Sequence, residues 1–310
     1  MKTLVTGGAG FIGNNIVRKL VEDVAEVRVL DNLSTGKKEN LTGVSGEIDF
    51  IKGDLTVPED VDKAVEGVDY VIHEAALPSV PRSLKNPLKT NKVNVEGTLN
   101  VLEAARKHEV KRVVYAGSSS AYGDTPTLPK KEEMPENPLS PYAVSKLAGE
   151  HYCRAFFNSY GLETVVVRYF NVFGARQNPD SQYSAVIPKF ITMMSAGENP
   201  SVYGDGTQSR DFTYIDNVVD GTVKACTVKK AAGEVINIAC NDRITVNQLV
   251  EDLNELMETN LEPKYLEERA GDVKHSQADI TKAKKLLDYI PLVGFKDGLR
   301  KTVEYYASLE

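Results

Sequence analysis

The first half of the chain alternates short apolar runs with stretches that have the apolar spacing of a helix. The apolar runs are, in chain order, KTLVTG, EVRVLD, IDFIKGD, VDYVIHEAA, VKRVVYAGSSS and LETVVVRYFN. They are mostly continuous, which is typical of strands that are covered on both faces. Helical patterns lie between them, near residues 11–23, 58–66, 86–108 and 141–160. This alternation predicts an α/β fold built on a doubly wound parallel sheet.

The second half is less regular. After residue 171 the chain has turn-rich stretches such as GARQNPDSQYS and YGDGTQSRD, which indicate loops. A helical pattern near 215–228 and the run EVINIA resemble the first half, so we expect them to rejoin the sheet. The tail from residue 243 carries two amphipathic helical patterns and a charged connection. We therefore predict a sheet domain over 1–170, completed by 212–242, and a smaller mixed lobe formed by 171–211 and 243–310.

Composition narrows the classes of partner. The chain has 310 residues and a formal net charge of -7, which gives no reason to expect a nucleic acid or an anionic membrane surface. Its three cysteines, Cys153, Cys226 and Cys240, lack metal-ligand spacing, so we expect reduced thiols and no metal site. The first strand pattern leaves no room for a signal segment, and no apolar run is long enough to span a membrane. These features predict a cytoplasmic protein.

A glycine-rich loop, TGGAGFIGNN, follows the first strand pattern and opens the first helical one. Gly8, Gly10 and Gly13 match G-x-G-x-x-G, and Gly7, Gly10 and Gly13 match G-x-x-G-x-x-G. Such glycines let the backbone approach a pyrophosphate, whose charge is favoured at a helix N-terminus. The loop in this context predicts a Rossmann-type dinucleotide site.

Acidic residues follow the next two strand patterns. Asp31 ends VRVLD, 21 residues beyond Gly10, where a carboxylate accepts hydrogen bonds from an adenosine ribose and repels a 2′-phosphate. No Arg follows in DNLSTGK, so NAD is favoured over NADP. Asp54 after the third strand has two interpretations, an adenine contact or a helix-capping residue.

The stretch SPYAVSK predicts a helix start, with Ser140 as N-cap and Pro141 as the first helical residue. Tyr142 and Lys146 then lie one turn apart on the same helix face. A Lys ammonium, a nicotinamide cation and the helix terminus would each lower the pKa of the tyrosine toward the working range of a base. With 14 Tyr and 37 Lys plus Arg in the chain, about one or two such pairs arise by chance, so a solvated surface pair remains the alternative.

Ser118 supplies a third group. It stands in AGSSSAYG after the fifth strand pattern, 24 residues before Tyr142, where its hydroxyl can share a hydrogen bond with Tyr142 and a substrate hydroxyl. A Ser-rich turn alone is an ordinary loop. Together with the dinucleotide loop and the Tyr–Lys pair, it predicts a site that oxidises a hydroxyl to a ketone.

The chain resembles the extended short-chain dehydrogenase/reductase family and, within it, the UDP-glucose and UDP-N-acetylglucosamine 4-epimerases. The resemblance spans nearly the whole length through TGGAGFIG, GDL, HEAALPSVPRS, NVEGT, SSSAYG, PYAVSK, RYFNVFG, RDFTYIDN and AGDVKHSQAD. It implies reversible inversion at C4 of a UDP-hexose through a 4-keto sugar, with NAD as cofactor and Ser118, Tyr142 and Lys146 as catalytic residues. Asn94 and Lys146 would help to hold the nicotinamide half, and Phe11 and Ile12 would contact the pyrophosphate through their backbone.

The same resemblance implies the full binding set. The cofactor residues would be Gly7, Gly10, Phe11, Ile12, Gly13, Asp31, Asn32, Ser34, Gly36, Asp54, Leu55, Ala75, Ala76, Asn94, Tyr142, Lys146 and Tyr169. The substrate residues would be Ser118, Ser119, Asn171, Val186, Tyr203, Arg210, Arg269, Asp272 and Ser276. The two arginines suit a diphosphate because their forked donors match its oxygens.

Ser276 bears on the choice of sugar. In the family, a bulky Tyr at this position restricts substrates to UDP-glucose and UDP-galactose, whereas a small residue leaves room for a 2-acetamido group. We therefore predict UDP-GlcNAc and UDP-GalNAc as substrates, with UDP-Glc and UDP-Gal as a second pair. An ordinary polar loop residue is the alternative for Ser276.

Rival functions share parts of this pattern. A UDP-glucuronate 4-epimerase fits the same motifs. Family dehydratases have Asp and Glu where this chain has Ser119 and Ser120, and decarboxylases keep an acid at the second of these positions, so a lyase is disfavoured. A non-enzymatic dinucleotide sensor is disfavoured by the intact Ser118, Tyr142 and Lys146. The family usually forms homodimers through a helix pair, here near 95–107 and 142–158, whose apolar residues have sheet-facing core as the other interpretation.

Overall fold

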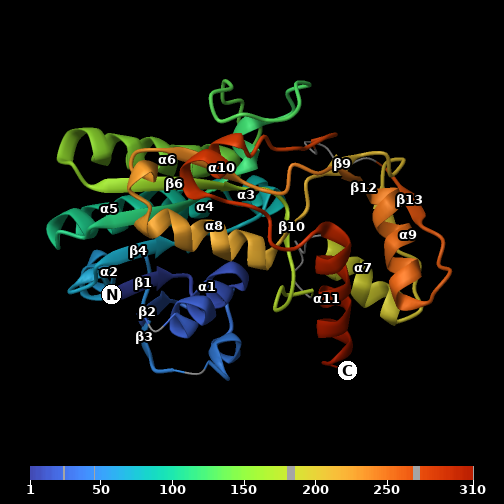
Figure 1. Ribbon diagram of the computed structural model, residues 1–310, viewed down its shortest axis with the longest axis horizontal. Helices are drawn as coiled ribbons and strands as arrows, with labels where there is room; N and C mark the ends of the chain where they lie inside the picture. Colours follow the sequence, from blue (N-terminus) through green and yellow to red (C-terminus); the bar gives the residue numbers. More distant parts are fainter. Residues whose placement is uncertain (24, 45, 180–185, 268–272, 310) are drawn as a thin grey trace.

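A parallel sheet forms the centre of the molecule (Figure 1). The computed structural model describes residues 1–310 except 24, 45, 180–185, 268–272 and 310. Each predicted strand is present, and the strands pair in the order β11-β6-β5-β4-β1-β2-β3 with every pairing parallel. The predicted α/β fold with a doubly wound parallel sheet is confirmed. The strands are β1 (Lys2–Thr6), β2 (Glu26–Asp31), β3 (Ile48–Lys52), β4 (Tyr70–His73), β5 (Arg112–Ser118), β6 (Glu163–Tyr169) and β11 (Val235–Ile238).

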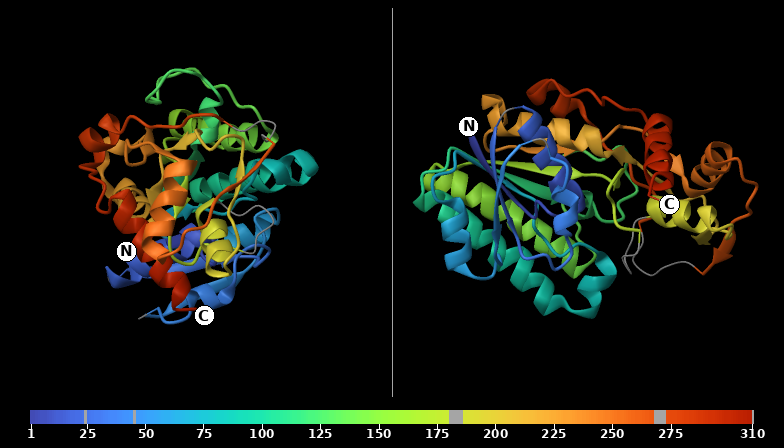
Figure 2. Two further views of the ribbon diagram at one scale, coloured as in Figure 1. Left: turned by 90° about the vertical axis from the view of Figure 1, so that its right-hand side faces the viewer. Right: turned by 90° about the horizontal axis from the view of Figure 1, so that it is seen from below.

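Helices cover both faces of this sheet, which explains why its strands are continuous apolar runs. One face carries α2 (Pro58–Val65), α5 (Gly97–Lys107) and α6 (Pro141–Tyr160), and the other carries α1 (Phe11–Glu22) and α8 (Ile215–Thr227) (Figure 2). Two apolar clusters result, one on each side, and the central strands are almost fully buried between them. The carboxyl ends of the strands therefore meet at one edge, where the sequence places its polar residues.

The segment predicted as one helix over 86–108 is helical throughout but not uniform. It consists of α4 (Pro87–Asn91), a π-helical turn (Lys92–Glu96) and α5, with helical backbone across both joins. It begins at Asn86, whose side chain caps α4, and Pro87 separates it from the preceding α3 (Val80–Lys85). The π-helical turn directs Asn94 inward, where its side chain hydrogen bonds with the backbone of Leu77 and with Ser145 Oγ.

Helix α6 begins and ends where its sequence predicts. The hydroxyl of Ser140 accepts a hydrogen bond of 3.1 Å from the backbone N–H of Ala143, and Pro141 is the first helical residue. Gly161 ends the helix in the left-handed conformation at φ 73°. Tyr142 and Lys146 thus stand in the first and second turns of a well-capped helix.

Apart from α10 (Thr281–Leu287), which packs over the sheet, the elements named next lie beside the sheet edge (Figure 1). They are β7 (Val172–Phe173) with β10 (Thr213–Tyr214), β8 (Ser201–Tyr203) with β13 (Lys264–Leu266), β9 (Ser209–Arg210) with β12 (Ile244–Thr245), and the helices α7 (Val186–Ser195), α9 (Val246–Met257) and α11 (Phe295–Ala307).

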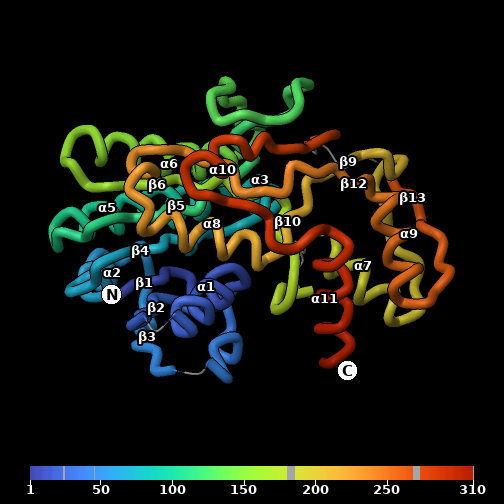
Figure 3. Tube along the Cα trace, viewed as in Figure 1, coloured from blue at the N-terminus to red at the C-terminus, as the bar shows by residue number. Residues whose placement is uncertain are grey.

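The tail has one helix more than predicted. α9 and α11 match the two amphipathic patterns, and α10 lies between them in the chain. α10 is only two turns long, too short for a periodic signal, and it packs against α8 and β11 (Figure 3). Among the described helices none has the length and apolar character needed to cross a membrane.

Candidate active site

A cavity of about 460 Å³ opens at the carboxyl ends of the strands. Most of the predicted cofactor residues line it. They are Gly7, Gly10, Phe11, Ile12, Gly13, Asp31, Asn32, Ser34, Asp54, Leu55, Ala75, Ala76, Tyr142, Lys146 and Tyr169. Residues from strands, loops and α6 that are far apart in the sequence therefore meet around one space.

Two predicted cofactor residues do not line this cavity. Gly36 packs beneath the glycine loop, because a Cβ atom there would lie 2.7 Å from the carbonyl of Ala9. Asn94 is buried, and its side chain is hydrogen bonded to the backbone of Leu77 and to the hydroxyl of Ser145. Both support the wall of the cavity from behind.

Several lining residues were not predicted. They are Leu30, Thr35, Gly53, Glu74, Leu77, Pro78, Lys89, Val93, Ala116 and Gly117. Glu74 is the acidic one among them. It follows β4 directly in VIHEAA. Asp31 and Ser118 also stand at the carboxyl end of a strand, so this position in the sequence could have indicated Glu74 as a site residue.

The glycine loop is shaped for a close ligand. Gly7 has φ +71°, and a Cβ atom at Gly13 would lie 2.2 Å from the carbonyl oxygen of Gly7, so neither position accepts a larger residue. Gly10 is the N-cap of α1 and offers no side-chain cap to the first-turn N–H groups. Unsatisfied N–H groups at a helix N-terminus suit the diphosphate of a dinucleotide.

Asp31 and Asp54 lie side by side in the cavity wall, at the ends of β2 and β3. Asp31 accepts hydrogen bonds from the backbone N–H groups of Ala9 at 3.0 Å and Leu33 at 2.8 Å, which ties the glycine loop to the end of β2. Asp54 accepts from the side chain of Asn32 at 2.8 Å and from Thr56. Asp54 does not cap α2, whose N-cap is residue 57. Asp54 lines the cavity instead, and its contact with an adenine stays a prediction.

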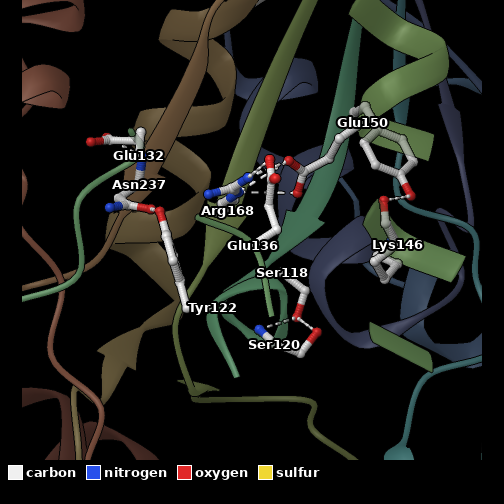
Figure 4. A network of polar contacts seen from close by, with 10 residues as sticks. Ser118, Ser120, Tyr122, Glu132, Glu136, Lys146, Glu150, Arg168 and Asn237 are labelled. Carbon is white, nitrogen blue, oxygen red and sulfur yellow. Dashed lines mark hydrogen bonds and ion pairs between the residues drawn. The ribbon is translucent and has the colours of Figure 1, made fainter. Parts of the chain in front are cut away.

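Tyr142 and Lys146 form one wall of the cavity, and Ser118 lies at the end of β5 beside them. The buried Lys146 ammonium lies 4.8 Å from the ring centre of Tyr115. The hydroxyl of Ser118 accepts hydrogen bonds from the backbone N–H of Ser120 at 3.2 Å and from its hydroxyl at 2.8 Å (Figure 4). The loop after β5 therefore holds Ser118 in a defined orientation.

Burial dominates the electrostatics of Tyr142. Burial raises the pKa of Tyr142, its hydrogen bond with Ser118 lowers it in part, and the Glu74 carboxylate raises it again. The net shift is upward because desolvation is its largest cause. The lowering expected from Lys146 and from a nicotinamide cation stays a prediction.

Lys146 and His73 are both affected by burial. Burial lowers the pKa of Lys146 to about 8, against the opposing effect of the Glu74 and Glu150 carboxylates. Burial, together with the Lys146 charge, lowers the pKa of His73 to about 3. His73 is therefore neutral, with its ring nitrogens paired to Thr6 at 2.7 Å and Thr98 at 3.0 Å.

The predicted substrate residues that the structure describes do not line the cofactor cavity. Arg210 on β9 donates to the carbonyl oxygen of Lys274 at 3.1 Å, and the backbone N–H of Ser276 donates to Ser209 at 3.0 Å. The structure thus brings Arg210 and Ser276 onto neighbouring extended segments, although 66 residues separate them in the sequence.

The other substrate residues have separate positions. Asn171 follows β6 and donates to the carbonyl oxygen of Asp211 at 3.3 Å, and Ser119 begins the turn after Ser118. Val186 is the first residue of α7 and Tyr203 the last of β8. Arg269 and Asp272 lie outside the described residues.

A glycine cradle at the carboxyl ends of a parallel sheet, joined to a Tyr–Lys pair in one cavity, defines a dinucleotide-dependent enzyme of the Rossmann type. The chain belongs to the NAD dependent epimerase/dehydratase family, which matches residues 3–239. Its resemblance to the extended short-chain dehydrogenase/reductases is thereby confirmed, and NAD is its cofactor.

Similar proteins cover the chain from end to end. It is 38% identical to the putative UDP-glucose 4-epimerase of Methanocaldococcus jannaschii over 97% of both chains. It is 42% identical, with a TM-score of 0.93, to the UDP-N-acetylglucosamine 4-epimerase of Methanobrevibacter ruminantium solved with UDP-N-acetylmuramic acid, covering 100% of this chain and 99% of that one. The UDP-glucose 4-epimerase of Thermotoga maritima solved with UDP-glucose is 39% identical with a TM-score of 0.95, and both chains are covered completely.

Proposed function

We propose that the protein interconverts UDP-GlcNAc and UDP-GalNAc by NAD-dependent inversion at C4, with UDP-Glc and UDP-Gal as a second pair. It is an enzyme of the UDP-sugar 4-epimerase kind, as its family and its 4-epimerase relatives indicate. Beyond this class of enzyme, the proposal specifies which sugars the protein converts.

The observation that carries the chemistry is the meeting of Ser118, Tyr142 and Lys146 at the dinucleotide cavity. NAD, held by the residues of the cavity, would supply the acceptor for the hydride of C4 and its donor for return to the opposite face. Tyr142 takes the proton of the 4-hydroxyl, Ser118 orients that hydroxyl, and Lys146 supplies positive charge near the phenol. When the hydride returns, Tyr142 gives the proton back, so that the sugar is inverted at C4 with no net change in its oxidation state.

The nucleotide must stay bound while the sugar turns over between the two hydride transfers. We assign this anchoring to Asn171, Val186, Tyr203 and Arg210, together with Arg269 and Asp272 outside the described residues. An arginine guanidinium suits this task because it presents two parallel donors to phosphate oxygens. Arg210 is positioned for it by the pairing of β9 with β12 and by its bond to Lys274.

The small side chain of Ser276 supports an N-acetylated sugar. Ser276 is buried, and it belongs to the segment that pairs with Ser209 beside Arg210. A tyrosine in its place would fill space that a 2-acetamido group needs. The absence of an acid at Ser119 and Ser120 argues against elimination or decarboxylation, which require a proton donor next to Ser118.

A panel of UDP-sugars tests the proposal. Purified protein is incubated with UDP-GlcNAc, UDP-GalNAc, UDP-Glc, UDP-Gal and UDP-glucuronate, and the C4 products are identified by NMR. We expect turnover of the N-acetylated pair and its loss in Ser276→Tyr, while Ser276→Ala keeps the wild-type preference. Turnover of UDP-galactose but not UDP-GalNAc, or exclusive turnover of UDP-glucuronate, would contradict the assigned sugar.

We also propose a cytoplasmic homodimer. Its reduced cysteines, of which Cys153 and Cys226 are buried, suit a reducing compartment.

For the dimer, α6 offers an exposed apolar surface. Val144 and Tyr152 on α6 are 53% and 36% exposed and face away from the sheet, whereas Val101 and Leu102 of α5 are core residues. Sedimentation of the purified protein measures the oligomeric state, and a monomer at micromolar concentration would contradict this proposal.

A further inference from the structure

Glu74 brings a carboxyl group into the cofactor cavity beside the acid–base pair. Its Oε1 accepts a hydrogen bond of 2.6 Å from the hydroxyl of Tyr169, and that hydroxyl lies 2.8 Å from Thr222 Oγ1 on α8. Glu74 and Tyr169 line the same cavity as Tyr142 and Lys146. The carboxyl group is therefore held by Tyr169 of β6, which Thr222 of α8 holds in turn, and it lines the cofactor cavity.

The proposed proton transfers do not use this carboxyl group. Tyr142 exchanges the proton of the sugar hydroxyl, with Ser118 as its partner. Burial raises the pKa of Glu74 to about 7, and the Tyr169 hydrogen bond and the Lys146 ammonium lower it only in part. A carboxyl group that is costly to ionise and has no part in proton transfer requires another explanation.

The titratable groups that interact with Glu74 are Lys146 and Tyr142 from α6 and Tyr169 from β6. Two further groups lie next to these: His73 precedes Glu74 at the end of β4, and Cys226 of α8 interacts with Tyr169. His73 and Cys226 are neutral because burial lowers the pKa of the first to about 3 and raises that of the second to about 12. Lys146 is thus the cation of this group and Glu74 the anion.

We propose that Glu74 favours the oxidised form of the bound nicotinamide. The oxidised ring carries a positive charge and the reduced ring carries none, so a carboxylate in the same cavity attracts only the oxidised form. The Lys146 ammonium, which the acid–base chemistry needs, acts in the opposite direction. Glu74 offsets that effect.

The balance between the Glu74 carboxylate and the Lys146 ammonium matters for an epimerase in particular. The sugar gives up a hydride and a proton and must take both back before it leaves. If the keto sugar escapes first, the cofactor stays reduced and that enzyme molecule is inactive. A carboxylate that favours oxidised NAD makes the return of the hydride more favourable. The inference rests on the proposed function in that it takes this cavity as the nicotinamide site.

The reduction potential of the bound cofactor tests the proposal without an activity assay. Holoenzyme is equilibrated with a redox dye couple, and the ratio of NADH to NAD is read from the nicotinamide absorbance. In Glu74→Gln the side chain keeps its size and can still accept from Tyr169, but it has no charge. We expect this ratio to rise roughly tenfold at about pH 8.5, which is about 30 mV for a two-electron couple.

Glu74→Asp is the matched control, because it keeps the charge and should keep the potential close to that of wild type. At about pH 5.5, where Glu74 is protonated, wild type and Glu74→Gln should agree. An unchanged potential in Glu74→Gln at about pH 8.5, or an equal shift at both pH values, would overturn the inference.

If Glu74→Gln fails to retain NAD, the wild-type potential measured against pH gives the same test. It should show an inflection between about pH 5 and 8 that free NAD lacks, and its absence would overturn the inference. Wild-type protein that binds no NAD would instead overturn the proposed function.

Discussion

Glu150 and Arg168 form a buried ion pair one helical turn beyond Lys146 (Figure 4). Arg168 donates from Nε to both carboxylate oxygens at 3.1 Å and from Nη2 to Oε2 at 2.8 Å. The two side chains are only 3% and 2% exposed. Because Arg168 directly precedes Tyr169 on β6, the pair joins the helix of the acid–base residues to a strand that lines the cavity.

Arg168→Met should therefore destabilise the protein strongly. The substitution leaves the Glu150 carboxyl group buried without its partner, and losing one member of a buried pair costs about 3–5 kcal/mol. The free energy of unfolding, measured by urea denaturation at neutral pH, checks this value.

Two controls separate the charge effect from packing. The double variant Glu150→Met with Arg168→Met removes both charges and should recover most of the lost stability. Arg106→Met removes a pair with Glu103 whose side chains are 43% and 53% exposed, and it should cost no more than about 1 kcal/mol. An equal cost for Arg168→Met and Arg106→Met would contradict the assigned role of the buried pair.

Tyr142→Phe should abolish most of the epimerase activity. The variant keeps the ring in the cavity wall but has no phenol to exchange the proton of the sugar hydroxyl, and such a group contributes about 10²- to 10⁴-fold to the rate. The turnover number in a coupled assay checks this, and retention of NAD shows that the site is intact. The same loss is not expected for Tyr152→Phe, a tyrosine on the same helix that is 36% exposed. Wild-type turnover in Tyr142→Phe would refute the catalytic assignment.

Much of the fold was predictable because its signals are local. Continuous apolar strand patterns report a sheet covered on both faces, and the Ser140–Pro141 start of α6 follows from capping alone. The start of the predicted helical segment at Asn86 and Pro87 follows from capping too. α10 lacks any periodic signal, since its stability comes from packing against α8 and β11.

The site was predictable where motifs carry it and not where tertiary contacts do. Ser118 and Tyr142 belong to recognisable stretches, and the structure places both beside the cofactor cavity. Glu74 is part of an apolar run, and its meaning depends on Tyr169, 95 residues away. The raised pKa of Tyr142 also depends on burial and on Glu74, which no spacing in the sequence reports.

Glu74→Gln should change how stability depends on pH. Burial raises the pKa of Glu74 to about 7 in the folded protein, whereas an unfolded glutamate titrates near about 4.3. Between these values the folded state binds more protons than the unfolded state, so the contribution of Glu74 to the free energy of unfolding is complete below about pH 4 and falls until about pH 7. Gln keeps the acceptor for Tyr169 and has no such decline. Relative to wild type, the variant should gain about 3 kcal/mol between about pH 4.5 and 8, measured by urea denaturation at matched NAD saturation. His73 titrates equally in both proteins, so it cancels when their free energies of unfolding are subtracted. A difference in the free energy of unfolding that is constant with pH would refute the raised pKa of Glu74.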